Sequence, residues 1–479
     1  MIKFDNTYIE LPEQFYKSTK AEEFKSPYLI EVNKDFADRG LGLDFNSLSD
    51  EDLALLFSGQ DVPEGAAQIA LAYAGHQFGH YSPQLGDGRA LLLGEILSPE
   101  GKRLDIQLKG SGQTPFSRRG DGRSSLGPVI REYIVSEAMY HLGVPTTRAL
   151  AAVGTGEMVY RERPLPGGIF TRVASSHIRI GSFEYFAASG DITAVKALAD
   201  YAIHRHYPEI EGEENVYLHF IESVANAQAL LVAKWMSFGF IHGVMNTDNM
   251  SISGETLDYG PCAFMDNFSF DKVFSSIDTM GRYAYNNQIS IAKWNLFRLA
   301  ESLLPLIHTD LNKAMEVTEK SISGYVHIYE QKWLEQMKPK LGLMSDHEND
   351  KDLIQQWLQY LQNEDLDFTL SFRKLSGGIE SFKPTTAFKE FYLPWQQRLD
   401  MQSATSIEVK SCMNRTNPIY IARNHQVERA IQAAYKGDFS VFKKMNRIFR
   451  NPYELQDNCE EYALAPMESE RITATFCGT

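Results

Sequence analysis

The chain has few cysteines, no excess of basic residues, and neither an internal repeat nor a low-complexity tract. Its four cysteines among 479 residues include no Cys-x-x-Cys pair, which excludes a disulfide framework and a zinc ribbon and fits a reducing compartment. Lys and Arg number 47 against 62 Asp and Glu, for a net charge of −15. This balance argues against a nucleic-acid partner and against binding to an anionic membrane.

The amino-terminal residues also lack a targeting pattern. Residues 1–16 contain acids and no apolar core, so we expect no secretory signal and a cytoplasmic protein. The most apolar long stretch, from Val224 to Met245, includes Lys234 and His242. We therefore predict a buried helix that runs into a loop, and no membrane span.

Length and composition predict a folded chain of about three domains, or one two-lobed body with an appendage. The hydrophobic fraction of 43% is ordinary for a folded protein. The first half mixes helix and strand patterns, whereas the second half is mainly helical. A monomer is expected, although no residue pattern determines the oligomeric state.

Three local patterns define the first half. Residues from about 50 to 75 are Ala- and Leu-rich and predict a helix. An apolar run at 89–96, a turn cluster at 98–102 and an alternating run at 104–110 predict a hairpin. In its second strand Leu104, Ile106 and Leu108 would share one face, and Asp105, Gln107 and Lys109 the other.

A helix is predicted from about Pro128 to Leu142. Proline suits the first turn of a helix, and Gly143 suits the position just after its end. The apolar stripe of this helix leaves Glu132 on a different face.

Residues suited to nucleotide-phosphate chemistry follow in a suggestive order. A glycine turn at 86–90 (GDGRA) opens the first hairpin strand, and Lys109 ends the second. Glu132 lies on the next helix, and Asn249 and Asp258 lie on loops after the apolar stretch. Glycines let backbone amides approach phosphate, lysine neutralises it, glutamate holds the lysine, and Asn with Asp holds a divalent cation.

The spacing resembles that of protein kinases. The segment 242–249 (HGVMNTDN) has the His-to-Asn spacing of the kinase catalytic loop, and 258–260 (DYG) resembles the kinase DFG. However, Gly243 and Val244 stand where kinases have Arg and the catalytic Asp. The pattern is therefore that of a pseudokinase.

Longer segments resemble the selenoprotein O family, in the family's order and over about half of the chain. These are residues 73–95, 105–150, 170–184, 242–266 and 283–305. The resemblance implies an α+β, two-lobed protein-kinase-like fold with a helical carboxy-terminal extension. It also implies four parts: an amino-terminal helical or irregular segment (1–72), an N-lobe-like nucleotide-binding region (73–185), a C-lobe-like region (186–310) and the extension with its tail (311–479).

The family's activity implies a protein adenylyltransferase that moves AMP from ATP to Ser, Thr or Tyr hydroxyls, with Mg²⁺ or Mn²⁺ and a nucleotide flipped relative to kinases. Asp248 would accept the proton, and Asn249 and Asp258 would hold the metal. Nucleotide contacts would come from ten residues: Gly86, Gly88, Arg89, Lys109, Asp121, Gly122, Glu132, Arg172, Arg179 and Asp258.

The residue chemistry agrees with these implied roles. Pyrophosphate leaves when the α-phosphorus is attacked, and two guanidiniums that never deprotonate are suited to its charge. Asp248 precedes Asn249 directly, so its carboxylate could reach an acceptor hydroxyl. Two alternatives stay open: a kinase-type phosphotransferase that uses a different base, and an ATP-binding scaffold without turnover. The target proteins cannot be read from the sequence.

Two further motifs contain side chains that can bind metal or change redox state. His76 and His80 have metal-like i,i+4 spacing but lack a third ligand, so we interpret them as structural. Cys477 stands third from the end, where relatives carry selenocysteine or cysteine. A redox-sensing disulfide from Cys477 to Cys262, four residues after Asp258, is the hypothesis that follows from this position.

Overall fold

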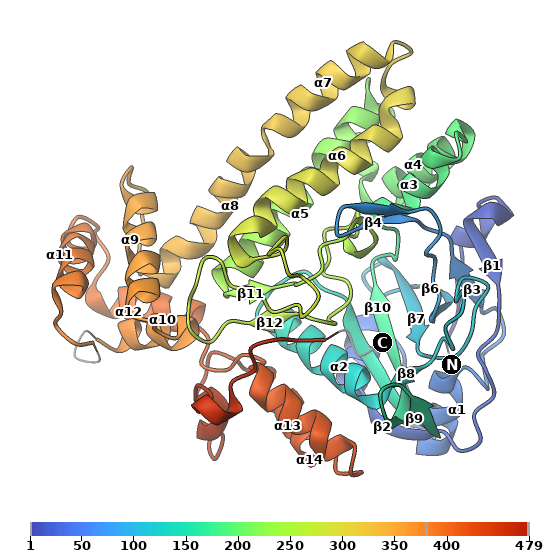
Figure 1. The fold of residues 1–479 in the computed structure, drawn as a ribbon, viewed down its shortest axis with the longest axis horizontal. Coiled ribbons are helices and arrows are strands. Elements are labelled where there is room, and N and C mark those ends of the chain that lie inside the picture. The colour runs from blue at the N-terminus through green and yellow to red at the C-terminus, as the bar shows by residue number, and fades with distance from the viewer. Residues whose placement is uncertain (1, 379–381, 477–479) are drawn as a thin grey trace.

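The computed structural model describes residues 2–378 and 382–476. A lobe built around a β-sheet lies at the lower right of Figure 1, with a helical lobe above it and a helical extension to the left. The expected α+β, two-lobed arrangement with a helical carboxy-terminal extension is confirmed.

Antiparallel pairing builds the sheet of the first lobe. In the described chain the strand order is β1-β3-β6-β7-β10-β9-β2, and β8 pairs with β10. The bounds are β1 Tyr16–Ser18, β2 Tyr28–Val32, β3 Ile69–Leu71, β6 Ala90–Leu97, β7 Arg103–Lys109, β8 Ser124–Ser125, β9 Arg148–Tyr160 and β10 Pro164–Ala174.

The predicted hairpin is confirmed as β6 and β7, which pair antiparallel from Ala90 opposite Lys109. On the apolar face of β7, Ile106 and Leu108 pack in a core that includes Leu53 and Phe57 of helix α1, Asp50–Ser58. The polar face of β7 is buried as well. A strand buried on both faces needs a partner for every polar side chain, and this requirement organises the site described below.

The helix predicted over residues 50 to 75 is wrong beyond Ser58. The side chain of Ser49 caps α1, and Gly59 ends the helix in a left-handed conformation at φ 79°. The apolar run that follows forms β3, in which all three residues are buried. An apolar run of this length fits a buried strand as well as a helix. Residues 1–72 thus contribute β1, β2 and β3 to the sheet.

The helix predicted from Pro128 is confirmed as α2, Leu126–His141. Gly143 follows with φ 80°. The amide of Val144 donates to the carbonyl of Met139, and that of Gly143 to Tyr140. This pair of bonds is the Schellman motif that ends helices at a glycine.

Helices build the second lobe: α3 Ile180–Ala188, α4 Ile192–His206, α5 Val216–Ser237, α6 Gln288–Ile307, α7 Leu311–Ser323 and α8 Tyr325–Lys340. Two two-stranded sheets accompany them, β4 Gly75–Gln77 with β5 His80–Ser82, and β11 Phe240–Ile241 with β12 Ala263–Phe264. Short 3-10 helices lie at Tyr8–Glu10, Glu13–Phe15, Pro208–Ile210, Thr247–Asn249, Tyr285–Asn287, Glu460–Ala463 and Glu468–Glu470, and a π-helical turn at Phe36–Gly40.

Helix α5 is the one helix in the described residues that is long and apolar enough to cross a membrane. Half of its most apolar window is buried inside the fold, where α5 packs against α6 and α8. The core helices of soluble proteins have the same composition. The prediction of a buried helix running into a loop is confirmed.

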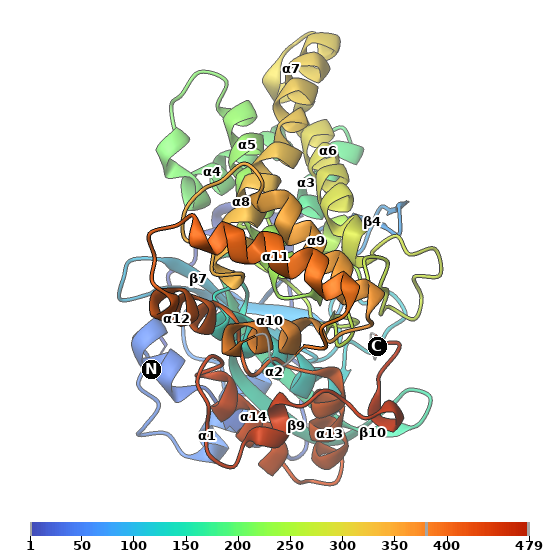
Figure 2. The ribbon, with the colours of Figure 1, turned by 90° about the vertical axis from the view of Figure 1, so that its left-hand side faces the viewer.

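The extension continues with α9 Asp350–Asn363, α10 Phe368–Gly377, α11 Thr386–Asp400, α12 Ser406–Thr416, α13 Asn424–Ala434 and α14 Ser440–Phe449. Helices α13 and α14 return to pack against α2 (Figure 2). A Cβ at Gly127 would lie 2.3 Å from the hydroxyl of Tyr435, so α2 and α13 approach closely. Buried Arg423 pairs with Asp266 and Asp367. The extension therefore contacts both lobes.

Candidate active site

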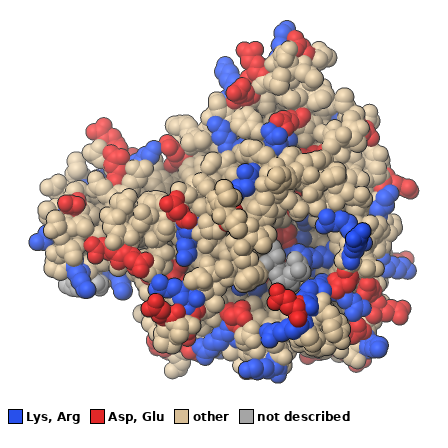
Figure 3. Space-filling view, in the orientation of Figure 1, with Lys and Arg blue, Asp and Glu red and all other residues tan. Residues whose placement is uncertain are grey.

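One cavity of about 930 Å³ lies between the lobes. Figure 3 shows Lys and Arg side chains gathered to the right of the centre of this face of the molecule. It brings together every site residue expected from the sequence. These are Gly86, Gly88, Arg89, Lys109, Asp121, Gly122, Glu132, Arg172, Arg179, Asp248, Asn249 and Asp258.

Lys109 is paired inside the protein. Its Nζ lies 2.6 Å from Oε1 of Glu132 and also contacts Oδ1 of Asp258. The side chains of Lys109 and Glu132 are only 9% and 7% exposed. The pair is therefore not a surface ion pair of small energetic value. Lys109 thus links its own strand β7 to Glu132 on α2 and to Asp258 on the loop that follows the 3-10 helix Thr247–Asn249.

The two arginines, seven residues apart in the chain, meet at the same aspartate. Arg172 Nη1 lies 3.0 Å from Oδ1 of Asp258, and Arg172 Nε donates to Gln107 at 2.9 Å. Arg179 Nη1 lies 3.9 Å from the other oxygen of Asp258 and stacks its guanidinium 4.4 Å from the ring centre of Tyr73. Three cations thus surround one carboxylate.

Asp258 is held ionised by these neighbours. Burial opposes its ionisation, but Arg172, Lys109 and Arg179 outweigh burial and hold the pKa of this carboxyl well below its usual range. Its backbone is left-handed at φ 60°, which is uncommon for a residue other than glycine. Such strain is typical of functional sites.

Asp248 has the opposite character. Burial raises the pKa of its carboxyl to about 6, although Arg179 opposes the shift. Its Oδ1 is buried and has no hydrogen-bond partner in the described part of the chain. A carboxylate with a pKa close to neutral is suited to accept a proton at physiological pH.

Asn249 and Asp258 offer oxygen donors at the same cavity. The amide nitrogen of Asn249 donates to the carbonyl of Val244 at 3.0 Å, which leaves the amide oxygen as the donor available to a cation. Mg²⁺ and Mn²⁺ prefer oxygen ligands, and at phosphate sites Mg²⁺ uses one or two protein ligands together with phosphate and water. The residues present fit such an ion.

Glycines allow two loops to meet above the cavity. A Cβ at Gly86 would lie 2.3 Å from Cγ of Phe116, and one at Gly122 would lie 2.0 Å from the carbonyl oxygen of Gly112. Both glycines also have positive φ, 63° and 66°. No other residue fits at these positions without displacing the loops.

Asp121 is already engaged at the cavity edge. Arg161 approaches its carboxylate to 2.8 Å, and this hydrogen bond lowers the pKa of Asp121. Its side chain is therefore less available to a ligand than those of Lys109 and the two arginines.

The sequence analysis missed Asp87, inside the same glycine turn. Its carboxylate is buried, accepts from Gln107 and from the amide of Leu71, both at 3.1 Å, and lies 3.8 Å from Arg179. Burial raises the pKa of Asp87. The signal available in the sequence was the acid between two glycines, which was interpreted only as part of a turn.

The remaining candidates from the sequence are two histidines and two cysteines. His76 binds Glu184, and His80 is exposed. No cluster of three or more metal-binding His, Cys, Asp or Glu side chains occurs in residues 2–378 and 382–476. Burial raises the pKa of the Cys262 thiol to about 12. Cys477 lies outside the described residues, so its disulfide with Cys262 stays a prediction.

Comparison with known proteins identifies a matching family model and many similar proteins. The family model described as protein adenylyltransferase SelO matches residues 1–450. Proteins named protein nucleotidyltransferase YdiU are similar over nearly the whole chain. That of Agrobacterium fabrum is 51% identical over 488 residues, covering 100% of both chains, and that of Bacillus cereus is 52% identical over 481 residues, covering 99% of this chain and 98% of the relative.

Among solved structures, ROP2 from Toxoplasma gondii is described as a virulence factor with a protein-kinase fold and no enzymatic activity. It matches 72% of this chain and 86% of its own, at 9% identity and a TM-score of 0.23.

Proposed function

The chain belongs to the protein adenylyltransferase SelO family, and we propose that it transfers AMP from ATP to Ser, Thr or Tyr hydroxyls of other proteins. The proposal is supported mainly by the arrangement of charged side chains around one cavity. Lys109, Arg172 and Arg179 converge there, with Asp248 on the same wall.

In the proposed reaction the acceptor oxygen attacks the α-phosphorus. The bond from that phosphorus to the bridging oxygen breaks, and pyrophosphate leaves with its electrons. Lys109, Arg172 and Arg179 bind the phosphate oxygens and stabilise the charge that develops on the leaving group. Their fixed positions in β7, β10 and the segment before α3 mean that little reorganisation is needed.

Asp248 accepts the hydroxyl proton of the target side chain. This role suits a buried carboxylate whose Oδ1 has no partner in the described structure. Asp248 would also take the place of the kinase catalytic Asp, since Gly243 and Val244 stand where kinases have Arg and that Asp.

Asn249 and Asp258 would hold Mg²⁺ or Mn²⁺. When bound, such an ion neutralises phosphate charge and orients the triphosphate. We place the reaction in the cytoplasm, where ATP is available and where the cysteine content fits.

ATP labelled at the α or the γ position tests the reaction class. With the purified protein, a divalent cation and a mixture of candidate proteins, we expect protein-bound label from the α position only. Label from the γ position only would indicate a kinase. Stabilisation by ATP without label from either position would indicate a scaffold.

Asp248→Asn separates chemistry from nucleotide binding. The substitution keeps the shape of the side chain but removes its basicity, so kcat should fall about 10²-fold or more while ATP affinity is retained. Transfer at the wild-type rate would show that another group accepts the proton.

A further inference from the structure

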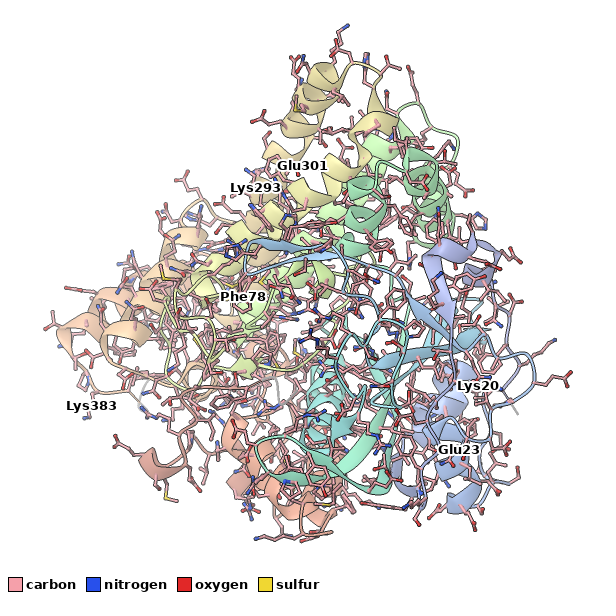
Figure 4. The ribbon with its side chains drawn as sticks, turned by 45° about the vertical axis from the view of Figure 1, so that its right-hand side comes forward. Lys20, Glu23, Phe78, Lys293, Glu301 and Lys383 are labelled. Atoms are coloured by element: carbon pink, nitrogen blue, oxygen red, sulfur yellow. The ribbon has the colours of Figure 1, made fainter. Side chains whose placement is uncertain are left out.

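The β4–β5 hairpin crosses the loop that carries Asp248. The amide of His76 donates to Oγ1 of Thr247 at 2.7 Å, and the amide of Phe78 donates to Oδ1 of Asn246 at 3.0 Å. Phe78, labelled in Figure 4, lies at the turn of this hairpin between β4 and β5. The hairpin backbone is thus bonded to the two residues that precede Asp248.

Glu184 of α3 completes the connection. One of its carboxylate oxygens lies 2.5 Å from Nδ1 of His76, and the other accepts the hydroxyl hydrogen of Thr247. Thr247 is completely buried, and Glu184 is 5% exposed. Thr247, His76 and Glu184, here called the Thr247 cluster, therefore tie the loop to the hairpin and to a helix. Buried hydrogen bonds of this kind fix a geometry because the alternative is an unpaired polar group.

The hairpin and the start of α3 pack closely against the loop that carries Asp248. A Cβ at Gly75 would lie 2.6 Å from Oδ1 of Asp248, and one at Gly181 would lie 2.1 Å from the carbonyl oxygen of Ala74. Arg179 donates to the backbone carbonyl of Asp248 at 2.9 Å. The hairpin, the start of α3 and the loop are packed in backbone contact.

The cluster does not share the cavity with the nucleotide. Its three side chains are absent from the cavity lining, whereas Gln77 and Phe78 of the same hairpin belong to it. An effect of the cluster on transfer must therefore act through the loop. Displacement of a reacting group by about 1 Å can reduce a rate about 10²-fold.

We propose that Thr247, His76 and Glu184 are positioning residues that hold Asp248 against the acceptor hydroxyl. The proposal rests on the proposed function, because it assigns the cluster a role in that reaction. It assigns no contact with ATP, so loss of the cluster should reduce kcat and leave the KM for ATP unchanged.

Thr247→Val is the informative variant, because it removes the hydroxyl at nearly constant volume. Thr247→Ser retains the hydroxyl and should recover most of the wild-type rate. Thr318→Val is the matched control, since Thr318 of α7 is also buried and its hydroxyl has no partner in the described structure. Transfer of α-label is measured against ATP concentration, and ATP affinity is measured by calorimetry.

We expect Thr247→Val to lower kcat about 10- to 100-fold, with unchanged KM and ATP affinity. Equal kcat for Thr247→Val and wild type would overturn the proposal. So would parallel loss of kcat and ATP affinity, which indicates a general structural role. If Thr247→Val does not fold, Glu184→Gln, which keeps the size of the side chain, is measured by the same criteria.

Amide exchange provides a readout that needs no activity. The amide of Asn249 donates to the carbonyl of Asn246, and this bond should open more often in Thr247→Val than in Thr318→Val. Unchanged exchange at residues 247–250 would reject the proposal even if the wild type transferred no label. Absence of label from the wild type alone would instead reject the proposed function.

Discussion

The Nη1 atom of Arg172 lies 3.0 Å from Oδ1 of Asp258, the same oxygen that Lys109 contacts. Asp258 is therefore a counter-ion of the cations that we assign to the phosphates. Arrival of a triphosphate and its metal would exchange these partners, because the phosphates would take the cations and the metal would take the carboxylate.

This exchange predicts two effects of Asp258→Asn. Transfer should be lost, since a metal ligand is removed. The fold should also lose about 3 kcal/mol, because three buried cations lose a carboxylate that they share. ATP without metal should restore more stability to Asp258→Asn than to the wild type, as measured by the shift in Tm. An equal shift in both proteins would contradict the exchange.

Gly75 provides a steric test of the loop that carries Asp248. Gly75→Ala places a methyl group 2.6 Å from Oδ1 of Asp248, so the carboxylate must move. We expect kcat to fall about tenfold or more at unchanged ATP affinity. Gly377→Ala is the matched control, because a Cβ there meets no atom of the described residues within 4 Å. Full activity of Gly75→Ala would mean that the position of Asp248 tolerates displacement.

Local sequence patterns were sufficient to predict two features of the first lobe, the hairpin β6–β7 and helix α2. The hairpin β6–β7 follows from alternation and a turn, and α2 follows from its proline, its apolar stripe and Gly143. The residues that determine each of these elements lie within the element or only a few positions from it. The order of Lys109 and Glu132 along these elements was therefore informative, and in the structure the two side chains form an ion pair.

Long-range pairing was not accessible in the same way. His76 was interpreted as structural, and in the structure its ring contacts Glu184. That partner lies 108 residues away, and no periodicity links the two positions. Asp105 and Gln107 were assigned to a polar face, which usually means a solvated one. Here that face is buried, and Arg205 of α4 and Arg172 of β10 supply its partners. The misassigned helix before β3 has a related cause, since burial on both sides removed the alternation.

Buried His177 predicts how stability depends on pH. Burial lowers the pKa of His177 to about 4, although a hydrogen bond from its ring to Asp105 opposes the shift. The unfolded chain protonates this histidine near pH 6.5, so between pH 6.5 and 4 the unfolded state binds more protons. Stability should therefore fall as the pH is lowered through this range.

The measurement is denaturant unfolding of His177→Gln and wild type at pH 7 and pH 4. The wild type should lose about 1–3 kcal/mol more than the variant between these two pH values. Exposed His327 is the control, and His327→Gln should keep the wild-type pH dependence. Identical pH dependence of all three proteins would contradict a neutral buried His177.

Asp105 adds a second, more acidic step. Burial opposes its ionisation, but Arg205 and His177 outweigh burial and lower the pKa of Asp105 to about 2. The stability that it contributes is present above pH about 4 and is lost toward pH 2. The two steps share one direction but occupy separate pH windows. His177→Gln should remove the less acidic step, and it should also weaken the second, because His177 contributes to the lowered pKa of Asp105.

Lys340, at the end of α8, is buried without an opposite charge. It is 2% exposed, and its ammonium lies 4.7 Å from the ring centre of Phe372 and 5.2 Å from that of Phe238. No ion pair of Lys340 occurs within the described residues. Burial lowers the pKa of this lysine to about 7. Attraction to aromatic rings offsets only part of this desolvation cost.

Lys340→Met should therefore stabilise the protein by about 1–3 kcal/mol at neutral pH, since methionine fills a similar volume without a charge. The folded-state pKa is lowered, so the penalty develops as the pH falls from about 10 to 7, and the gain should shrink above pH 9. Lys338→Met is the control: this lysine pairs with Asp346, and its replacement should change stability by less than about 0.5 kcal/mol. A lower Tm for Lys340→Met would mean that the aromatic contacts stabilise the ammonium more than burial disfavours it.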